Sequence, residues 1–119
     1  MRRLKWLVLL CLTLLAACSQ PLPAARADYV GRWEGPGMVL AITAEGEVSY
    51  QRVDGGVTTR IDAPIKEFRG HDFVVGLGMF TTTFAVTAPP QRQDGEWRMT
   101  VDGVTLRRTQ GPRPPTTAI

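Results

Sequence analysis

Residues 94–108 decide the fold class and read Asp-Gly-Glu-Trp-Arg-Met-Thr-Val-Asp-Gly-Val-Thr-Leu-Arg-Arg. The Asp-Gly pairs at 94–95 and 102–103 supply the positive φ angles that tight hairpin turns need. Apolar residues alternate with polar ones between these turns, at Trp97, Met99 and Val101. Because side chains alternate across a strand, one face of this segment is apolar and the other meets water. The stretch therefore predicts antiparallel strands joined by short turns.

The same rhythm continues through residues 28–109, where turn signals recur about every 8–12 residues, as in a sandwich or barrel. We expect strands at 29–34, 38–42, 48–53, 57–61, 73–77, 80–86, 97–101 and 104–108. Residues 65–68 break the two-residue period and predict a bulge or an irregular crossing. The predicted domain is all-β, a small antiparallel up-and-down barrel or sandwich of eight or nine short strands.

Composition and charge exclude several classes of protein. The 119 residues suit one domain, and 44% hydrophobic content is too high for a wholly disordered chain. Three of the 14 basic residues are Arg2, Arg3 and Lys5, so the rest of the chain carries 11 basic against 11 acidic groups. Because the chain after Lys5 has no net charge, we expect no nucleic-acid partner.

The first eighteen residues have the layout of a secretory signal, with a basic start, an uncharged run over residues 6–15 and a small-residue end. Ten helical residues reach roughly 15 Å, about half of the hydrocarbon core, so this run is too short for a membrane span. Leu15-Ala16-Ala17-Cys18 resembles the lipobox of bacterial lipoproteins at all four positions. The resemblance implies cleavage before Cys18 and acyl chains on its sulfur and amino group.

That resemblance divides the chain into a signal peptide (residues 1–17), an acylated cysteine with its tether (18–27), the β domain (28–109) and a disordered Pro-rich tail (110–119). Two or more acyl chains hold a protein stably on a bilayer. The implied partners are thus the membrane, through Cys18, and the lipoprotein processing and sorting machinery. In the family, Asp after the cysteine often retains the protein in the inner membrane. Ser19 stands there and favours the outer membrane, facing the periplasm.

A second resemblance concerns the β domain. Gly31-Arg32-Trp33 is similar to the Gly-x-Trp start of lipocalin-like barrels. In that family a basic residue near the last strand packs across the tryptophan, which implies this role for Arg107 or Arg108. The predicted domain is much shorter than a lipocalin. Its large aromatic side chains are expected to fill the interior rather than line a ligand pocket: Trp33, Phe73, Phe80, Phe84 and Trp97.

Groups for catalysis and metal binding are scarce. His71 is the one histidine and follows Gly70, which is typical of a solvent-facing turn residue. A zinc site normally needs three or four ligands, and the mature chain offers one histidine with no free thiol once Cys18 is acylated. A triad of Ser49, His71 and an aspartate is left open, but no nucleophile elbow accompanies it. We predict no catalytic residue, cofactor or metal.

The function expected from these features is a non-enzymatic binding, inhibitory or structural module of the cell envelope, acting on an unknown envelope protein or lipid. The alternatives are a lipocalin-like carrier of a small hydrophobic ligand and a hydrolase that uses His71. Residues 81–83 are three threonines, which suit an exposed strand face and could also present an edge to a partner by strand addition.

Overall fold

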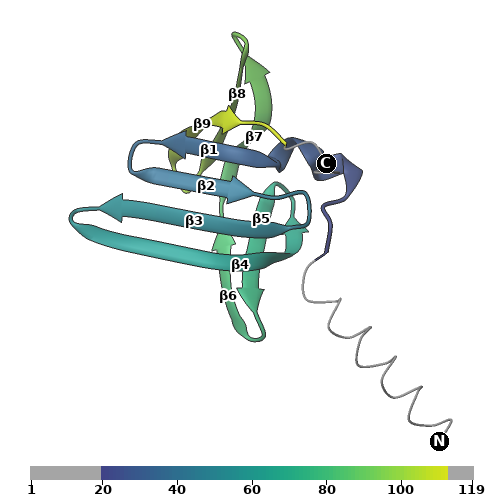
Figure 1. Cartoon of the computed structure of the whole chain (residues 1–119), viewed down its shortest axis with the longest axis vertical. Coiled ribbons are helices and arrows are strands. Elements are labelled where there is room, and N and C mark those ends of the chain that lie inside the picture. Colours follow the sequence, from purple (N-terminus) through teal and green to yellow (C-terminus); the bar gives the residue numbers. More distant parts are fainter. Residues whose placement is uncertain (1–19, 113–119) are drawn as a thin grey trace, which may run out of the picture.

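The computed structural model describes residues 20–112, which form nine strands and one short 3-10 helix (Figure 1). The elements in chain order are η1 (Ala24–Tyr29), β1 (Gly31–Gly35), β2 (Met38–Ile42), β3 (Glu47–Asp54), β4 (Val57–Arg69), β5 (Asp72–Leu77), β6 (Phe80–Phe84), β7 (Val86–Gln93), β8 (Glu96–Val101) and β9 (Val104–Gln110). The all-β prediction and the predicted number of strands are confirmed.

All nine strands belong to one curled antiparallel sheet, in the order β6-β5-β4-β3-β2-β1-β9-β8-β7. The first and last strands therefore pair, with Trp33 opposite Arg108. In Figure 1, strands β1–β4 cross in front of β5–β8 at a steep angle. This is the arrangement of orthogonal β packing, in which strands that bend at corners pass from one layer to the other.

A corner lies in β4, whose 13 residues serve both layers. Its N-terminal part pairs with β3 as far as Pro64, and its C-terminal part pairs with β5. The register shifts between Ile65 and Glu67. The bulge predicted at residues 65–68 is therefore confirmed, and it bends the strand as bulges do.

Within the other layer, a break at Ala85 separates β6 from β7. The Ala85 amide donates to Asp102 Oδ1 at 2.9 Å, and its carbonyl accepts from the Asp102 amide at 2.8 Å. The next amide, of Val86, donates to Asp72 Oδ1 at 2.7 Å. We expected one strand over residues 80–86. The structure instead divides this segment, because Asp102 of the β8–β9 turn and Asp72 at the start of β5 take hydrogen bonds that a continuous ladder would have used.

Strand β7 carries Pro89 and Pro90 and was not among the predicted strands. It lies at one end of the sheet order, and its pairing with β8 shifts register between Ala88 and Gln91. Proline lacks an amide proton and is tolerated in strands at edges and bulges. Edge position and register shift together explain why the two prolines do not prevent a strand here.

Aromatic side chains fill much of the interior between the layers. Phe73 stacks on Phe84 with ring centroids 5.1 Å apart, and Tyr50 meets Phe84 edge-on at 4.9 Å. Trp33 is fully buried, and Trp97 is partly buried against the core. The expectation that Phe80 faces inward is wrong, since its side chain is 81% exposed. Phe80 shares a strand face with Phe84, but its end of β6 extends past the opposite layer, which covers the Phe84 end alone.

Of the tether expected at residues 18–27, the structure describes residues 20–27, and these contact the domain. Leu22 packs partly against the core, and its amide donates to Ala44 O at 3.0 Å. Arg26 lies over the Phe68 ring, 4.5 Å from its centroid, and donates to Gly70 O at 2.7 Å. The Arg26 guanidinium and the Leu22 side chain thus have partners on the domain that composition alone did not reveal. At the other end, Gln110 still pairs with Arg32, and residues 113–119 of the predicted tail lie outside the described residues.

Candidate functional site

The predicted anchor, Leu15-Ala16-Ala17-Cys18, lies outside the residues that the structure describes. The first described residue, Gln20, shows where the chain enters the fold. Gln20 lines a surface hollow together with Lys66 of β4 and with Leu77 and Gly78 at the end of β5. A Cβ at Gly46 would overlap the Gln20 carbonyl oxygen, which shows how closely this entry packs on the turn between β2 and β3. The entry point and the hairpin of β5 and β6 are therefore neighbours.

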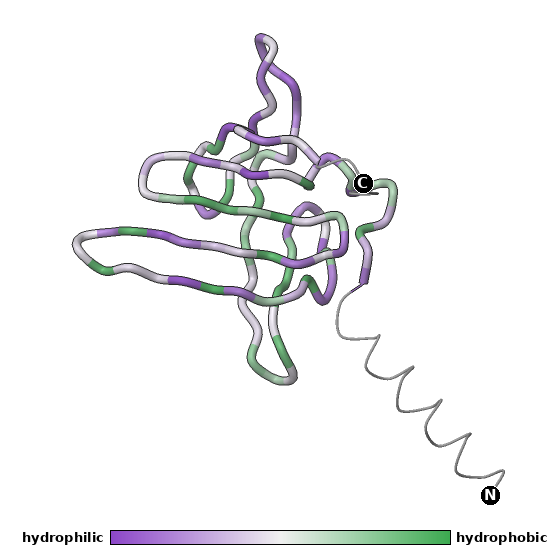
Figure 2. The backbone as a smooth tube through the Cα atoms, viewed as in Figure 1, coloured by the Kyte–Doolittle hydropathy of each residue, from purple (hydrophilic) through white to green (hydrophobic). Residues whose placement is uncertain are grey.

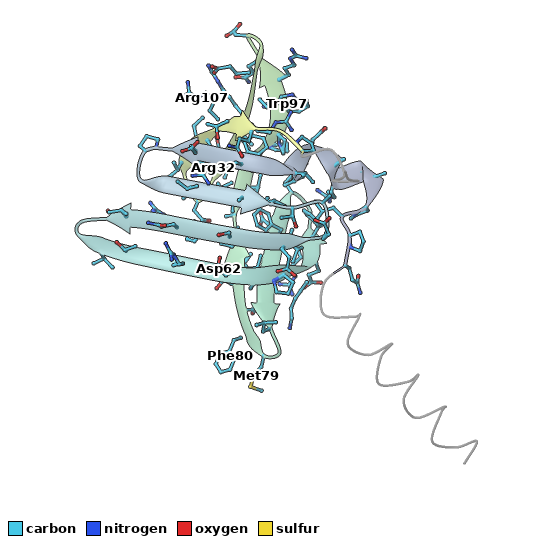
Figure 3. The ribbon with its side chains drawn as sticks, viewed as in Figure 1. Arg32, Asp62, Met79, Phe80, Trp97 and Arg107 are labelled. Carbon is cyan, nitrogen blue, oxygen red and sulfur yellow. The ribbon has the colours of Figure 1, made fainter. Side chains whose placement is uncertain are left out.

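The turn of that hairpin carries the two most exposed large apolar side chains of the described residues, Met79 at 88% and Phe80 at 81%. Leu77, just before the turn, is 60% exposed. We call these three residues the apolar tip. Figure 2 shows the hairpin as a hydrophobic projection, and Figure 3 labels Met79 and Phe80 at its end. Exposed apolar side chains gathered in one place commonly mark a surface that meets another molecule.

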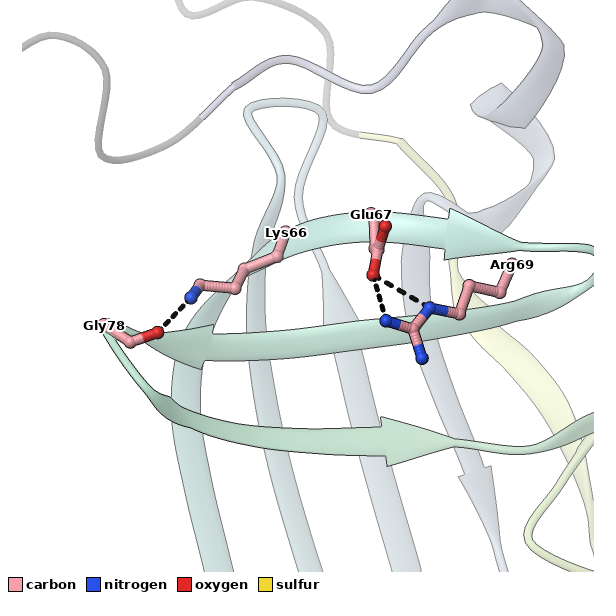
Figure 4. A network of polar contacts seen from close by, with 4 residues as sticks. All are labelled: Lys66, Glu67, Arg69 and Gly78. Atoms are coloured by element: carbon pink, nitrogen blue, oxygen red, sulfur yellow. Dashed lines mark hydrogen bonds and ion pairs between the residues drawn. The ribbon is translucent and has the colours of Figure 1, made fainter.

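Local sequence explains why the apolar tip forms. Gly78 adopts φ +61°, a left-handed value that glycine takes without steric cost, and it turns the chain between Leu77 and Phe80. The Lys66 ammonium donates to the Gly78 carbonyl and ties the turn to β4 (Figure 4). The stretch from 73 to 84 contains no charged residue, so Lys66 is the nearest cation that the described contacts assign to the turn.

Strand β6 is one end of the sheet, and among the described residues its ladder partner is β5. Thr81, Thr82 and Thr83 are all exposed. Both threonine expectations, an exposed face and an edge open to strand addition, are compatible with this position. The opposite end, β7, is interrupted by prolines, so the two edges differ in how readily another strand could pair with them.

A second hollow lies on the outer face of β1–β4 and is polar. Its lining residues include Arg32, Ser49, Gln51, Arg60 and Asp62, and Figure 3 labels Arg32 and Asp62 on this face. Arg60 donates to Gln51 Oε1 at 2.9 Å. Polar side chains on the outer face of a sheet commonly form hydrogen bonds with one another and with solvent. No member of this lining is the histidine that a Ser49 triad would require.

His71 lies in the turn between β4 and β5, where its side chain is exposed, as predicted. Its carbonyl accepts from the Tyr29 hydroxyl at 2.9 Å. Burial raises the pKa of that hydroxyl above its ordinary value, and the neighbouring Arg26 guanidinium partly offsets the rise. Tyr29 is 4% exposed, so this group joins η1 to the β4–β5 turn rather than facing a ligand.

The interaction implied by the lipocalin-like resemblance involves Arg108. Its guanidinium carbon lies 5.8 Å from the Trp33 ring centroid and 4.7 Å from that of Trp97. Arg107 points elsewhere and pairs with Glu96 at 3.7 Å. The sequence could not distinguish Arg107 from Arg108 as the residue that packs across Trp33, because the choice depends on the register between β1 and β9.

Comparison with known proteins returned no matching family model, no matching curated protein and no matching solved structure. Residues 20–112 hold no helix with the length and hydropathy of a membrane span. Over the same residues, no three His, Cys, Asp or Glu side chains gather as a potential metal site. Among the described residues, the apolar tip is the surface best suited to contact another molecule.

Proposed function

We propose that this chain is an acyl-anchored bacterial envelope lipoprotein whose β domain is a non-enzymatic binding, inhibitory or structural module. The observation that carries the proposal is the motif Leu15-Ala16-Ala17-Cys18 directly after an apolar run with a basic start. Retention by acyl chains on Cys18 would place the domain at the cell envelope, with the outer membrane favoured by Ser19.

The interior of the domain supports a binding surface over a carrier cavity. Nine side chains, Trp33, Phe73 and Phe84 the largest among them, are exposed by less than 2%. Among the described residues no charged or polar residue is buried, and no buried polar side-chain atom lacks a partner. The hollows described above open at the surface, and exposed residues such as Lys66 and Ser49 contribute to their lining. Protein interiors packed this closely leave little room for a lipid-sized guest.

Metabolic labelling with a palmitate analogue tests the anchor. The wild-type chain is expected to take up label, lose residues 1–17 and float with membranes. Cys18→Ser should abolish both labelling and cleavage. Cys11→Ser is the matched control, because this second cysteine lies inside the apolar run and is expected to leave with the signal. Unlabelled wild-type protein, or label that depends on Cys11, would refute the proposal.

The carrier alternative draws on the Gly31-Arg32-Trp33 resemblance and on the packing of Arg108 over Trp33. Native mass spectrometry of the domain separates the two functions. A domain without bound small molecules is expected, given the filled interior. A co-purifying apolar ligand of defined mass would instead favour the carrier.

A further inference from the structure

We infer that the apolar tip enters the same bilayer that holds the acyl chains, so that the protein meets the membrane at two points and is held in one orientation. This inference rests on the proposed function, since it takes Cys18 as the attachment point.

The reach of the chain is short. Cys18 precedes Gln20 by two residues, so even a fully extended backbone keeps the two Cα atoms within about 7 Å. The headgroup region on each side of a bilayer is roughly 5–8 Å thick. Acyl chains on Cys18 therefore hold Gln20 at, or just above, the headgroups. Gln20 lines one hollow with Leu77 and Gly78, so the base of the apolar tip lies on the same side of the domain as the anchor.

The chemistry of the apolar tip suits that position. Met79 and Phe80 project beyond the base and are almost fully exposed. No charged side chain lies between residues 73 and 84 to oppose transfer into the acyl region. The hydroxyls of Thr81 and its neighbours follow immediately along β6, where a polar headgroup layer would surround them. An apolar end with a polar shoulder is the pattern of an element that enters a membrane interface.

The charge beside the tip is also suitable. The Lys66 ammonium is exposed and bound to the Gly78 carbonyl, at the base of the turn. Basic groups at this depth attract the phosphates of anionic lipids. Arg69, three residues later in β4, pairs with Glu67 at 2.6 Å, whereas Lys66 contacts the turn beside the apolar tip (Figure 4).

A different hairpin provides the contrast. The turn between β3 and β4 also exposes apolar side chains, and Val57 there is 65% exposed. This turn projects in another direction in Figure 1, away from the apolar tip. Apolar exposure alone would favour both turns, whereas proximity to Gln20 favours the apolar tip. Val57 is therefore a matched control position.

The test uses the acylated full chain in vesicles of phosphatidylethanolamine and phosphatidylglycerol. Met79→Cys or Val57→Cys provides one free thiol, because Cys11 leaves with the signal and Cys18 is alkylated. Each thiol carries an environment-sensitive nitrobenzoxadiazole probe. We expect a blue-shifted emission and strong quenching by spin-labelled lipid at position 79, with solvent-like emission and weak quenching at position 57. Phe80→Cys serves as a second probe of the tip.

The outcomes separate the two proposals. Protein that fails to float with the vesicles would overturn the acyl anchor, and the inference would fall with it. Protein that floats, with a solvent-like probe at position 79, would overturn the inference alone. Equal quenching at positions 79 and 57 would also overturn it, because no orientation would be fixed. Shielding at position 79 that grows with protein concentration rather than with lipid would assign the apolar tip to a second copy of the chain.

Discussion

Replacing Gly31 with alanine should destabilise the domain strongly. Gly31 has φ +142°, in a region that side chains with a Cβ rarely adopt. A Cβ there would lie 2.7 Å from Arg108 Cδ and 2.7 Å from the Gln110 carbonyl oxygen. The backbone strain costs about 1–3 kcal/mol, and the overlap costs about 1–3 kcal/mol more. We therefore expect Gly31→Ala to lower the free energy of unfolding by about 2–6 kcal/mol.

The assay is urea unfolding of a chain that begins at Ser19, followed by tryptophan fluorescence. Gly55→Ala is the control, because Gly55 also has a positive φ, +57°, but a Cβ there would meet nothing within 4 Å. Gly55→Ala should lower the free energy of unfolding by about 1–2 kcal/mol, the cost of the backbone strain alone. Gly31→Ala should cost less in an Arg108→Ala background than in the wild type, although the Gln110 oxygen should maintain part of the loss in both. Equal losses for Gly31→Ala and Gly55→Ala would refute the reasoning.

Three further predictions concern the core, the β4–β5 turn and the titration of Tyr29. Phe84→Ala empties the centre of the aromatic core and should cost about 3–5 kcal/mol in urea unfolding, whereas Phe80→Ala should stay within about 0.5 kcal/mol; a large loss at Phe80 would contradict its exposure. His71→Ala should leave the unfolding midpoint unchanged, and cells that carry this variant should match wild-type cells in growth and envelope integrity. A defect in the cells with intact folding of the variant would instead favour the hydrolase alternative. Because burial raises the pKa of Tyr29, the folded state keeps the hydroxyl proton to a higher pH than the unfolded chain does. The stabilisation by the protonated hydroxyl is therefore complete below the ordinary pKa near 10 and is lost as pH rises through the raised value. Tyr29→Phe should flatten this alkaline decline in the melting temperature, and an unchanged decline would exclude Tyr29 as its source.

The strands found from sequence are those whose alternation is complete and bounded by turn residues. Residues 38–42 illustrate this, with Met38, Leu40 and Ile42 buried on one face as expected. Strand β7 was missed because Pro89 and Pro90 count against a strand unless its edge position is known. Phe80 was misplaced because alternation assigns a face without saying how far the covering layer extends.

The features of the candidate site also differ in how far the sequence predicts them. The lipobox residues are contiguous, so their prediction needs no tertiary information, although its test remains biochemical. The apolar tip was not recognised from sequence, since Phe80 was expected to face the interior and no local pattern marked Leu77 or Met79 as exposed. Their exposure follows from the length of the β5–β6 hairpin relative to the strands packed against it.

The sequence alone determined the all-β class, the bulge at residues 65–68 and the motif at Cys18, because each depends on spacing or chemistry within a few neighbouring residues. Tertiary structure decided which arginine meets Trp33, where the sheet turns its corners and which apolar residues stay exposed. It also brought Gln20 to the same hollow as Gly78, which lies 58 residues later in the chain. These features depend on register and curvature across the whole sheet, which accumulate over many strands and which no local pattern specifies.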